Sequence, residues 1–583
     1  MKKILFSIII FITFTLNVGK AQTVNFQWAK QMGDISNDRA HSVAIDAAGN
    51  VYTTGRFEGM VDFDPGAGTY NLTSAGWEDV FVSKLNSSGT FVWAKQLGGA
   101  NFDVANSIAV DAAGNIYTTG SFLGTSDFDP GLGVYNLTSI GSGDIFVSKL
   151  NSSGAFVWAK NFGGAGSGND AKSIAVDATG NVYTTGYFDS IVDFDPGISA
   201  YNLSAVGAYG GSVDVFISKL NASGNFVWAK QIGGGTNSGS IGNSITVDAA
   251  GNVYSTGWFA DIVDFDPGVG VYNIASSGTQ DIFVSKLNSS GAFVWAKSIG
   301  GSGTDIDIGS SIVLDASGNV YTTGGFSGTA DFDPGVGVYI LAGGGAFVSK
   351  LNVSGTFVWA KRTGIINSRS IALDASANVY TTGDFLGTAD FDPGVGVYNL
   401  IPSGVQDIFV SKLNASGAFV WAKQFGGAIS GYGIGTSIAV DGANNIYTTG
   451  CFVDTVDFDP GVGTYSLISA GFVVDDIFVH KMCQTSCPLG ISELPTPNSE
   501  LTISPNPNNG QFTLLLNNDA SAGSAQVENG EIILINSIGQ KVFEQKIIQG
   551  NNNINTNGLA KGLYDYLLLE NKQQIKNGKL VVE

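Results

Sequence analysis

The tract Asp62-Phe63-Asp64-Pro65-Gly66 returns along the chain and decides its architecture. Its seven copies are spaced 59 to 71 residues apart and begin at Asp62, Asp127, Asp193, Asp264, Asp331, Asp390 and Asp457. A period of this length is typical of repeat proteins, in which each repeat buries its apolar face against its neighbours. The sequence therefore predicts one unit of about 65 residues, repeated seven times.

Each repeat contains four short segments with the composition of β-strands. In the second repeat they are residues 107–111, 115–119, 144–150 and 156–160. They are rich in β-branched and aromatic residues and are bounded by Gly, Asn and Ser. The first two and the last two are joined by hairpin-sized connections. Four antiparallel strands per repeat, here called A to D, predict the blade of a β-propeller.

The order of the strands predicts that the ring is closed by the N-terminus. Strand D contains Trp-Ala-Lys, and the first of its seven copies, at Trp28, precedes the first strand A. The seventh strand C, residues 476–481, has no Trp-Ala-Lys after it. We therefore expect Asn25–Lys30 to complete the last blade and to remove an open sheet edge. The predicted fold class is all-β, with a closed seven-bladed propeller.

The repeats resemble those of a known family. Ser173–Gly186 and Phe216–Asn221 carry Ser-Ile-Ala-Val-Asp, Gly-Asn-Val-Tyr-Thr-Thr-Gly and a close relative of Phe-Val-Ser-Lys-Leu-Asn. These motifs resemble the SBBP repeats of bacterial secreted proteins, over residues 24–482. The resemblance implies the propeller fold. It implies no activity, since the family has no common catalytic motif.

The N-terminus reads as a secretory signal peptide. Lysines at positions 2 and 3 precede an apolar run from Ile4 to Val18, and Gly19 and Ala21 suit cleavage before Gln22. The apolar run is too short and wrongly flanked for a stable membrane span, and residues 1–21 are expected to be the signal peptide. Removing them leaves 25 basic and 49 acidic side chains. Such an acidic surface repels phosphate, so we expect no nucleic-acid partner.

The C-terminal part has a different composition. Residues 483–499 are expected to be a linker, because they contain three prolines and little periodicity. Residues 500–583 contain short alternating segments that predict a small Ig-like β-sandwich.

Its motifs, Ser504-Pro505-Asn506-Pro507, Gly562-Leu563-Tyr564 and Lys579–Glu583, resemble the C-terminal sorting domain of type IX secretion substrates. The resemblance implies that the type IX machinery is a partner. It also implies that the tail is removed and that the product is attached to the outer surface of a Gram-negative bacterium or released. The alternative is an accessory ligand-binding domain.

Three cysteines suit an exported protein. Cys483 and Cys487 are expected to close a small disulfide after the last blade, with metal or redox chemistry as the alternative. Cys451 is expected to stay free.

Residues suited to catalysis are scarce. The only histidines, His41 and His480, occupy different repeat positions, and no Gly-x-Ser-x-Gly, phosphate loop or Cys-x-x-Cys is present. We predict no catalytic residue and no cofactor. The recurrent Asp-Phe-Asp-Pro-Gly tract has two interpretations. Its residues suit a tight turn, and its paired carboxylates offer an alternative Ca²⁺ site.

Two positions differ from repeat to repeat. One is the residue x of Tyr-Thr/Ser-Thr-Gly-x-Phe at the end of strand B, and the other precedes the Ser of strand A. Both belong to the B-to-C and D-to-A side of the ring, and loops on a rigid scaffold commonly bind ligands. The predicted ligand-binding residues there are Arg56, Tyr187, Trp258, Asp384, His41, Lys172 and Arg369.

The sequence thus predicts a secreted, surface-attached propeller that binds glycans or proteins. A polysaccharide-acting enzyme with acidic residues in the B-to-C loops, Asp384 being the nearest candidate, is one alternative. A structural surface-layer component is the other.

Overall fold

A computed structural model describes residues 24–166, 168–205, 213–235, 238–364, 367–427, 431–461, 463–471 and 474–484, and most of 499–582. The chain divides into two compact units, residues 1–489 and 490–583. The expected signal peptide (1–21) and residues 485–498 of the expected linker lie outside the described residues. Within the described part, no helix has the length and apolar character needed to cross a bilayer.

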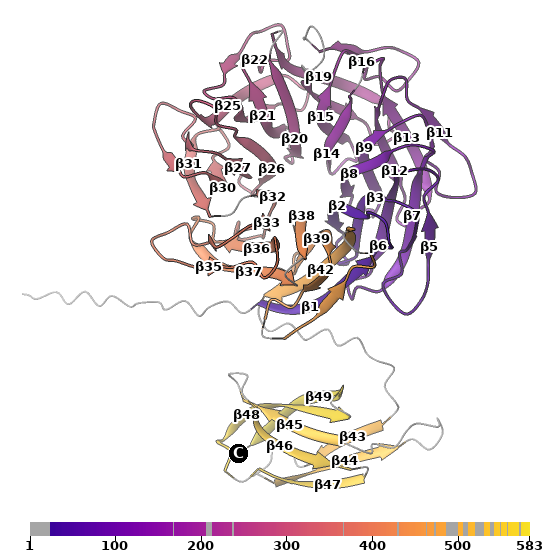
Figure 1. Ribbon diagram of the computed structural model, residues 1–583, viewed down its shortest axis with the longest axis vertical. Coiled ribbons are helices and arrows are strands. Elements are labelled where there is room, and N and C mark those ends of the chain that lie inside the picture. Colours follow the sequence, from indigo (N-terminus) through magenta and orange to yellow (C-terminus); the bar gives the residue numbers. More distant parts are fainter. Residues whose placement is uncertain are drawn as a thin grey trace, which may run out of the picture. The chain divides into compact units, whose positions relative to one another are not determined.

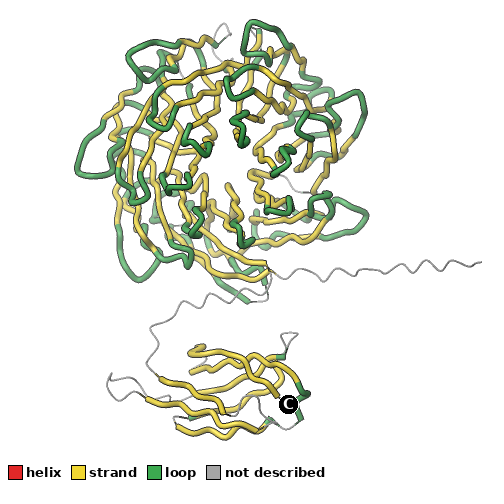
Figure 2. The backbone as a smooth tube through the Cα atoms, turned by 180° about the vertical axis from the view of Figure 1, so that it is seen from behind, coloured by secondary structure: helices red, strands yellow, loops and turns green. Residues whose placement is uncertain are grey.

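The first unit is the predicted seven-bladed propeller (Figure 1). Each blade is an antiparallel sheet in which strands A, B, C and D are neighbours in that order. Strand A lies nearest the centre of the ring, and loops project from its circumference (Figures 1 and 2).

The innermost strands A are β2 (Arg39–Ile45), β8 (Asp103–Val110), β14 (Asp170–Val176), β20 (Gly239–Val247), β26 (Ile308–Leu314), β32 (Asn367–Leu373) and β38 (Tyr432–Val440). Strands B are β3 (Val51–Phe57), β9 (Ile116–Phe122), β15 (Val182–Phe188), β21 (Val253–Ala260), β27 (Val320–Phe326), β33 (Val379–Phe385) and β39 (Ile446–Val453). Strands C are β6 (Asp79–Leu85), β12 (Asp144–Leu150), β18 (Asp214–Leu220), β24 (Asp281–Leu287), β30 (Gly345–Leu351), β36 (Asp407–Leu413) and β42 (Asp476–Gln484). Strands D are β7 (Phe91–Gly99), β13 (Phe156–Phe162), β19 (Phe226–Gly234), β25 (Phe293–Gly301), β31 (Phe357–Thr363), β37 (Phe419–Gly427) and β1 (Val24–Met32).

The N-terminal strand closes the ring, as predicted. β1 pairs with β42 from Val24↔Gln484 to Met32↔Ile477 and so supplies strand D of blade 7. Ala29 and Met32 of β1 are buried in this position. The last blade therefore has the same four strands as the others, and β42 has no exposed edge.

A ring of serine side chains joins strand A of each blade to strand A of the next. The Oγ of the serine accepts a hydrogen bond from a backbone N–H of the following blade, with distances of 3.2 to 3.4 Å. The seven pairs are Ser42–Ile108, Ser107–Ile174, Ser173–Ile245, Ser244–Ile312, Ser311–Ile371, Ser370–Ile438 and Ser437–Val43. Because the pair between blades 7 and 1 matches the other six, the closure is regular.

The Asp-Phe-Asp-Pro-Gly tract lies in a small hairpin between strands B and C. The hairpins are β4 (Met60–Asp62) with β5 (Asn71–Thr73), β10 (Thr125–Asp127) with β11 (Asn136–Thr138), β16 (Ile191–Asp193) with β17 (Asn202–Ser204), β22 (Ile262–Asp264) with β23 (Asn273–Ala275), β28 (Thr329–Asp331) with β29 (Ile340–Ala342), β34 (Ala389–Asp390) with β35 (Asn399–Leu400), and β40 (Thr455–Asp457) with β41 (Ser466–Ile468). The sequence predicted a turn here but not these short strands.

Four hairpins, which begin with β10, β22, β28 and β40, pair with strand D of the preceding blade. The other three contact single residues just after that strand, through Gly33↔Asp62, Gly163↔Asp193 and the bond from Gly364 N–H to the Asp390 carbonyl. β10, for example, pairs with β7 through Ser126↔Gly99. A Cβ at Gly99 would lie 2.2 Å from the carbonyl oxygen of Thr125, so only glycine allows this approach. The hairpins thus connect neighbouring blades at the circumference.

The acidic residues of the tract hold the hairpin turn. In the first repeat, Asp62 Oδ1 accepts hydrogen bonds from the N–H groups of Asp64 and Tyr70, and Asp64 Oδ1 accepts one from Gly66. The same bonds recur in the other six repeats. This is the expected turn role. The calcium alternative stays a prediction.

Tyr, Lys and Trp side chains of each blade form a repeated cluster at the A-to-B and C-to-D turns, which we call the constant face. In blade 1, the Tyr52 hydroxyl donates to Asp46 Oδ2 at 2.9 Å, Lys84 Nζ lies 4.9 Å from the Tyr52 ring centroid, and Trp93 packs edge-on at 6.3 Å. The cluster recurs in all seven blades. Burial, followed by the Asp46 partner, raises the pKa of Tyr52.

Two cysteines and one histidine lie in the last blade. Cys483 is in a disulfide and Cys451 is free and buried, whereas Cys487 lies outside the described residues. His480 is fully buried among the rings of Phe26, Phe425 and Phe458. It is a packing residue of the blade.

The second unit is a small all-β domain of two antiparallel sheets, as expected. Their strands are β43 (Ser499–Ser504), β44 (Gln511–Asn518) and β47 (Gly550–Asn555) in one sheet, and β45 (Gly530–Ile535), β46 (Lys541–Ile547), β48 (Gly562–Glu570) and β49 (Gln573–Val582) in the other. Phe512 and Leu514 from the first sheet and Ile532 and Leu568 from the second share one buried core.

Candidate binding face

The predicted ligand-binding residues lie at one end of strands A and B, on what we call the varied face, opposite the constant face. Position x is the penultimate residue of most strands B, as Arg56 is in β3. The residue before the serine is the extra residue of a β-bulge in strand A, as His41 is between Ala40 and Ser42. Bulges re-aim side chains and are common beside functional sites.

Four bulge residues join neighbouring blades. Each side chain donates a hydrogen bond to a backbone carbonyl of strand A in the next blade, at 2.9 Å. The donors and acceptors are His41 and Ala105, Asn106 and Ala171, Asn243 and Gly309, and Thr436 and Ala40. His41 was predicted to bind a ligand, and the structure places it in this inter-blade contact. Burial lowers the pKa of His41 to about 4, so its imidazole is neutral at neutral pH.

Lys172 and Tyr187 lie together in blade 3. The Lys172 ammonium forms an ion pair with Asp170 at 2.6 Å and lies 5.5 Å from the centroid of the Tyr187 ring. The Asp170 interaction outweighs burial and raises the pKa of Lys172. The structure therefore brings two of the predicted residues into one half-buried cluster.

Arg369 and Asp384 form an ion pair in blade 6. Arg369 Nε donates to Asp384 Oδ1 at 2.7 Å, and Asn367 Nδ2 donates to Oδ2 at 2.9 Å. The Asp384 side chain is 1% exposed, whereas that of Arg369 is 42% exposed. The carboxylate thus orients the guanidinium. The enzyme alternative would require Asp384 to line an open loop, which this buried carboxylate does not do.

The remaining position x residues have separate surroundings. Arg56 forms an ion pair with Glu78 at 2.6 Å. Trp258 is half-buried in β21, where it is paired with Ile241. Cys451 is buried, and this burial raises the pKa of its thiol.

A pocket of about 350 Å³ opens on the varied face between blades 5 and 6. It forms where blade 5 carries Gly325 at position x and Ser310 at the bulge, the smallest residues found at these positions. Ile308 and Phe326 give it apolar walls, and Arg369 contributes a cation. Ser327, Asn367 and Ser368 add polar groups, so the lining offers both apolar contact and hydrogen-bond partners to a small ligand.

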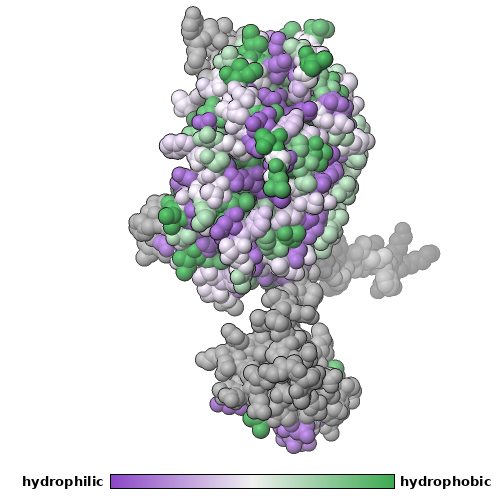
Figure 3. All heavy atoms as spheres, turned by 90° about the vertical axis from the view of Figure 1, so that its right-hand side faces the viewer, coloured by the Kyte–Doolittle hydropathy of each residue, from purple (hydrophilic) through white to green (hydrophobic). Residues whose placement is uncertain are grey.

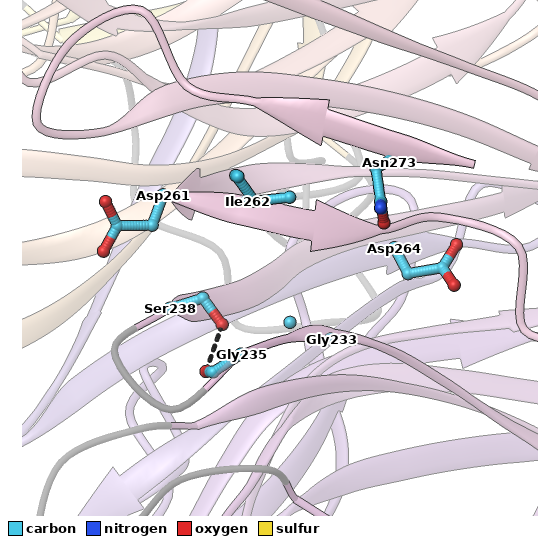
Figure 4. A pocket seen from close by; sticks show the side chains of 8 residues that line it. Gly233, Gly235, Ser238, Asp261, Ile262, Asp264 and Asn273 are labelled. Carbon is cyan, nitrogen blue, oxygen red and sulfur yellow. Dashed lines mark hydrogen bonds between the residues drawn. The ribbon is translucent and has the colours of Figure 1, made fainter. Parts of the chain in front are cut away.

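A larger pocket, about 550 Å³, lies between the D-to-A connection of blade 3 and the β22–β23 hairpin (Figure 4). Ser238 Oγ donates to the carbonyl of Gly235 at 2.8 Å within it. The carboxylates of Asp261 and Asp264 point away from one another (Figure 4). Its lining therefore does not assemble the facing carboxylates that a glycosidase requires.

Among the residues that the structure describes, no three His, Cys, Asp or Glu side chains gather in a way that could hold a metal ion.

Sequence reasoning missed an exposed aromatic pair on the varied face. Trp77, in the B-to-C connection of blade 1, stacks on Phe102, in front of β8, with ring centroids 5.5 Å apart. Both residues are exposed. Alignment of the repeats would have found Trp77, because blades 4 and 6 carry Thr279 and Val405 at its position.

Two family models match parts of the chain. The SBBP model, described as a β-propeller repeat, matches residues 27–56, 92–121, 227–258 and 420–450. A model described as a secretion system C-terminal sorting domain matches residues 502–583.

Similar proteins extend the comparison. An uncharacterized WD repeat-containing protein, L264, of Acanthamoeba polyphaga mimivirus is 24% identical over 484 residues, which are 73% of this chain and 31% of that protein. The chain thus spans about a third of that relative's length. Among solved structures, Sqt1 from Chaetomium thermophilum is 12% identical, with a TM-score of 0.32 over 78% of this chain and 90% of Sqt1. PorZ, a bacterial surface component of the type IX secretion system of Porphyromonas gingivalis, is 10% identical, with a TM-score of 0.22 over 95% of this chain and 100% of PorZ.

The protein is therefore a propeller of SBBP repeats followed by a type IX secretion sorting domain. The sorting domain implies handling by the type IX machinery and indicates secretion to the surface or exterior of a Gram-negative bacterium.

Proposed function

We propose that the propeller is a binding module that holds an extracellular glycan or protein on its varied face. The observation that best supports this is the pocket between blades 5 and 6. Its apolar walls suit an apolar part of a ligand, and the oriented guanidinium of Arg369 suits an acceptor or anionic group. The cluster of Lys172 with Tyr187, together with Trp258, extends the same face.

The test introduces into blade 5 a side chain that another blade already carries at the same position. In blade 3 the residue equivalent to Gly325 is Tyr187, so Gly325→Tyr fills the pocket with a side chain that a sister blade accommodates. Ser121→Tyr places the same side chain in blade 2 and is the matched control. The purified protein is screened on arrays of glycans and of extracellular proteins. We expect ligand binding to be lost in Gly325→Tyr and kept in Ser121→Tyr. Equal binding by all three proteins, or no binding by the unaltered protein, would contradict the proposal.

A further inference from the structure

The exposed pair Trp77 and Phe102 spans the boundary between blades 1 and 2. Their rings are inclined by 29° and are close to stacked, and the two residues are 64% and 47% exposed. Tryptophan is usually well buried in folded proteins. On the side of the ring shown in Figure 3, apolar side chains lie in small groups among hydrophilic ones. An exposed aromatic pair in such a surface indicates a place of contact.

Polar interactions fix the backbone under both rings. Beside Trp77, Glu78 is held by Arg56 at 2.6 Å, and its carbonyl accepts a hydrogen bond from the N–H of Asp103 at 2.8 Å. Beside Phe102, the buried Asp103 carboxylate accepts bonds from the N–H of Gly99 and the hydroxyl of Ser126. The pair is therefore positioned before any ligand arrives, which lowers the entropic cost of binding.

The fold itself does not require aromatic residues at these two positions. The parallel bridge Glu78↔Phe102 has equivalents in Gln280↔Ile306 and Gln406↔Tyr432. The residues that precede the first member of each bridge are Trp77, Thr279 and Val405. The same backbone thus accepts a small polar or an aliphatic side chain in place of the tryptophan, and packing does not explain Trp77.

We propose that Trp77 and Phe102 form a stacking platform for a sugar ring of a neutral polysaccharide. Two rings offer at most a few hundred Å², whereas a stable protein interface takes about 800 Å² from each partner. The adjacent Arg56 is neutralised by Glu78, and the chain carries a formal net charge of −21, so an acidic polymer is disfavoured. The platform rests on the proposed function in one respect, since it is a second binding site on the same varied face.

The experiment is affinity electrophoresis of the purified protein in gels that contain neutral polysaccharides (dextran, laminarin, galactomannan, xyloglucan) or acidic ones (alginate, hyaluronan). The variants are Trp77→Ala, Phe102→Ala and the conservative Trp77→Phe. Val405→Ala, at the equivalent exposed position of blade 6, is the matched control. Thermal unfolding verifies that each variant is folded.

We expect at least one neutral polysaccharide to retard the protein. Trp77→Ala and Phe102→Ala should weaken that binding by about tenfold or more, as is usual for aromatic anchors. Trp77→Phe should weaken it less, and Val405→Ala should leave it unchanged.

Three results would overturn the platform: retardation that survives Trp77→Ala, retardation by acidic polysaccharides alone, or none by any neutral polysaccharide. None of these results bears on the pocket between blades 5 and 6, which is tested by Gly325→Tyr. The failure of one proposal can therefore be distinguished from the failure of the other.

Discussion

The two faces of the ring use the same kinds of side chain in different ways. On the constant face, Tyr, Lys and Trp occur in every blade and contact one another at nearly the same distances. On the varied face, Trp77, Lys172, Tyr187 and Arg369 occur once each, in surroundings that differ from blade to blade. A group repeated seven times with the same partners holds the blades together. A group that occurs once and is also exposed, as Trp77 is, has no such role to explain it and is where binding should be sought.

The constant and varied faces exist only in a closed ring. We therefore expect the largest effect from a deletion that opens the ring. Deleting residues 24–32 removes β1 and exposes the edge of β42. An open edge templates pairing with other chains. We expect the protein to aggregate and to lose its cooperative unfolding transition, as measured by size-exclusion chromatography and thermal unfolding. A monomeric protein of unchanged stability would show that β1 is not part of the ring.

Substitutions in one hairpin test whether the repeated acidic residues stabilise the fold. Asp264→Ala removes the acceptor for the N–H groups of Asp266 and Tyr272. Each hydrogen bond to a charged group contributes about 1.5–3 kcal/mol, so losing two should lower the free energy of unfolding by about 3 kcal/mol in urea titration. Asp266→Ala, which removes one bond, from Gly268, is the control and should cost about half as much. No loss in either variant would favour the calcium alternative over the turn.

Because the histidine of blade 7 is buried, we predict that the stability of the protein depends on pH. Burial lowers the pKa of His480 to about 3, whereas an unfolded histidine titrates near 6.5. Between these values the unfolded state binds the proton and the folded state does not, so stability is present above pH 6.5 and is lost as the pH falls. The loss by pH 5 is about 2 kcal/mol from this residue.

His480→Ser restores the residue found in the other repeats. We expect its stability to fall by about 2 kcal/mol less than that of the unaltered protein between pH 7 and pH 5, measured by urea titration. Identical slopes for the two proteins would show that His480 does not titrate as a buried group.

The smallest effect is expected at the serine ring. Ser173→Ala removes one acceptor, for the N–H of Ile245 at 3.2 Å, and should cost about 1 kcal/mol of unfolding free energy. Equivalent substitutions at Ser42 and Ser437 should cost similar amounts, because the ring is regular across its closure. A much larger effect at Ser437, beside the closure, would show that blades 7 and 1 are joined differently from the others.

The strands of the blades could be predicted because each segment recurs seven times with the same β-branched and aromatic pattern. The hairpin strands could not, because two or three residues show no alternation and their partner, strand D of the preceding blade, is distant in sequence. The N-terminal closure was predictable by counting copies of Trp-Ala-Lys.

The candidate site was harder to predict for two physical reasons. His41, Asn106, Asn243 and Thr436 differ in identity but share a hydrogen-bond donor, so their variation conceals one constant role. The partnership of Arg369 with Asp384 occurs once, so no repeat pattern points to it. The pocket beside Gly325 depends on small side chains, and the space that they leave is visible only in three dimensions.

The most direct test of the contrast between the faces compares one tryptophan from each. Trp228 of the constant face is 9% exposed and edge-on to Tyr183, whereas Trp77 of the varied face is 64% exposed. Each is replaced by alanine, and both unfolding in urea and retardation by neutral polysaccharide are measured. We predict that Trp228→Ala loses about 3–5 kcal/mol of stability, the usual cost for a buried tryptophan, and keeps binding while it is folded. We predict that Trp77→Ala loses binding with a stability change below about 1 kcal/mol. Equal losses of stability, or binding that depends on Trp228 and not on Trp77, would contradict the division of roles between the two faces.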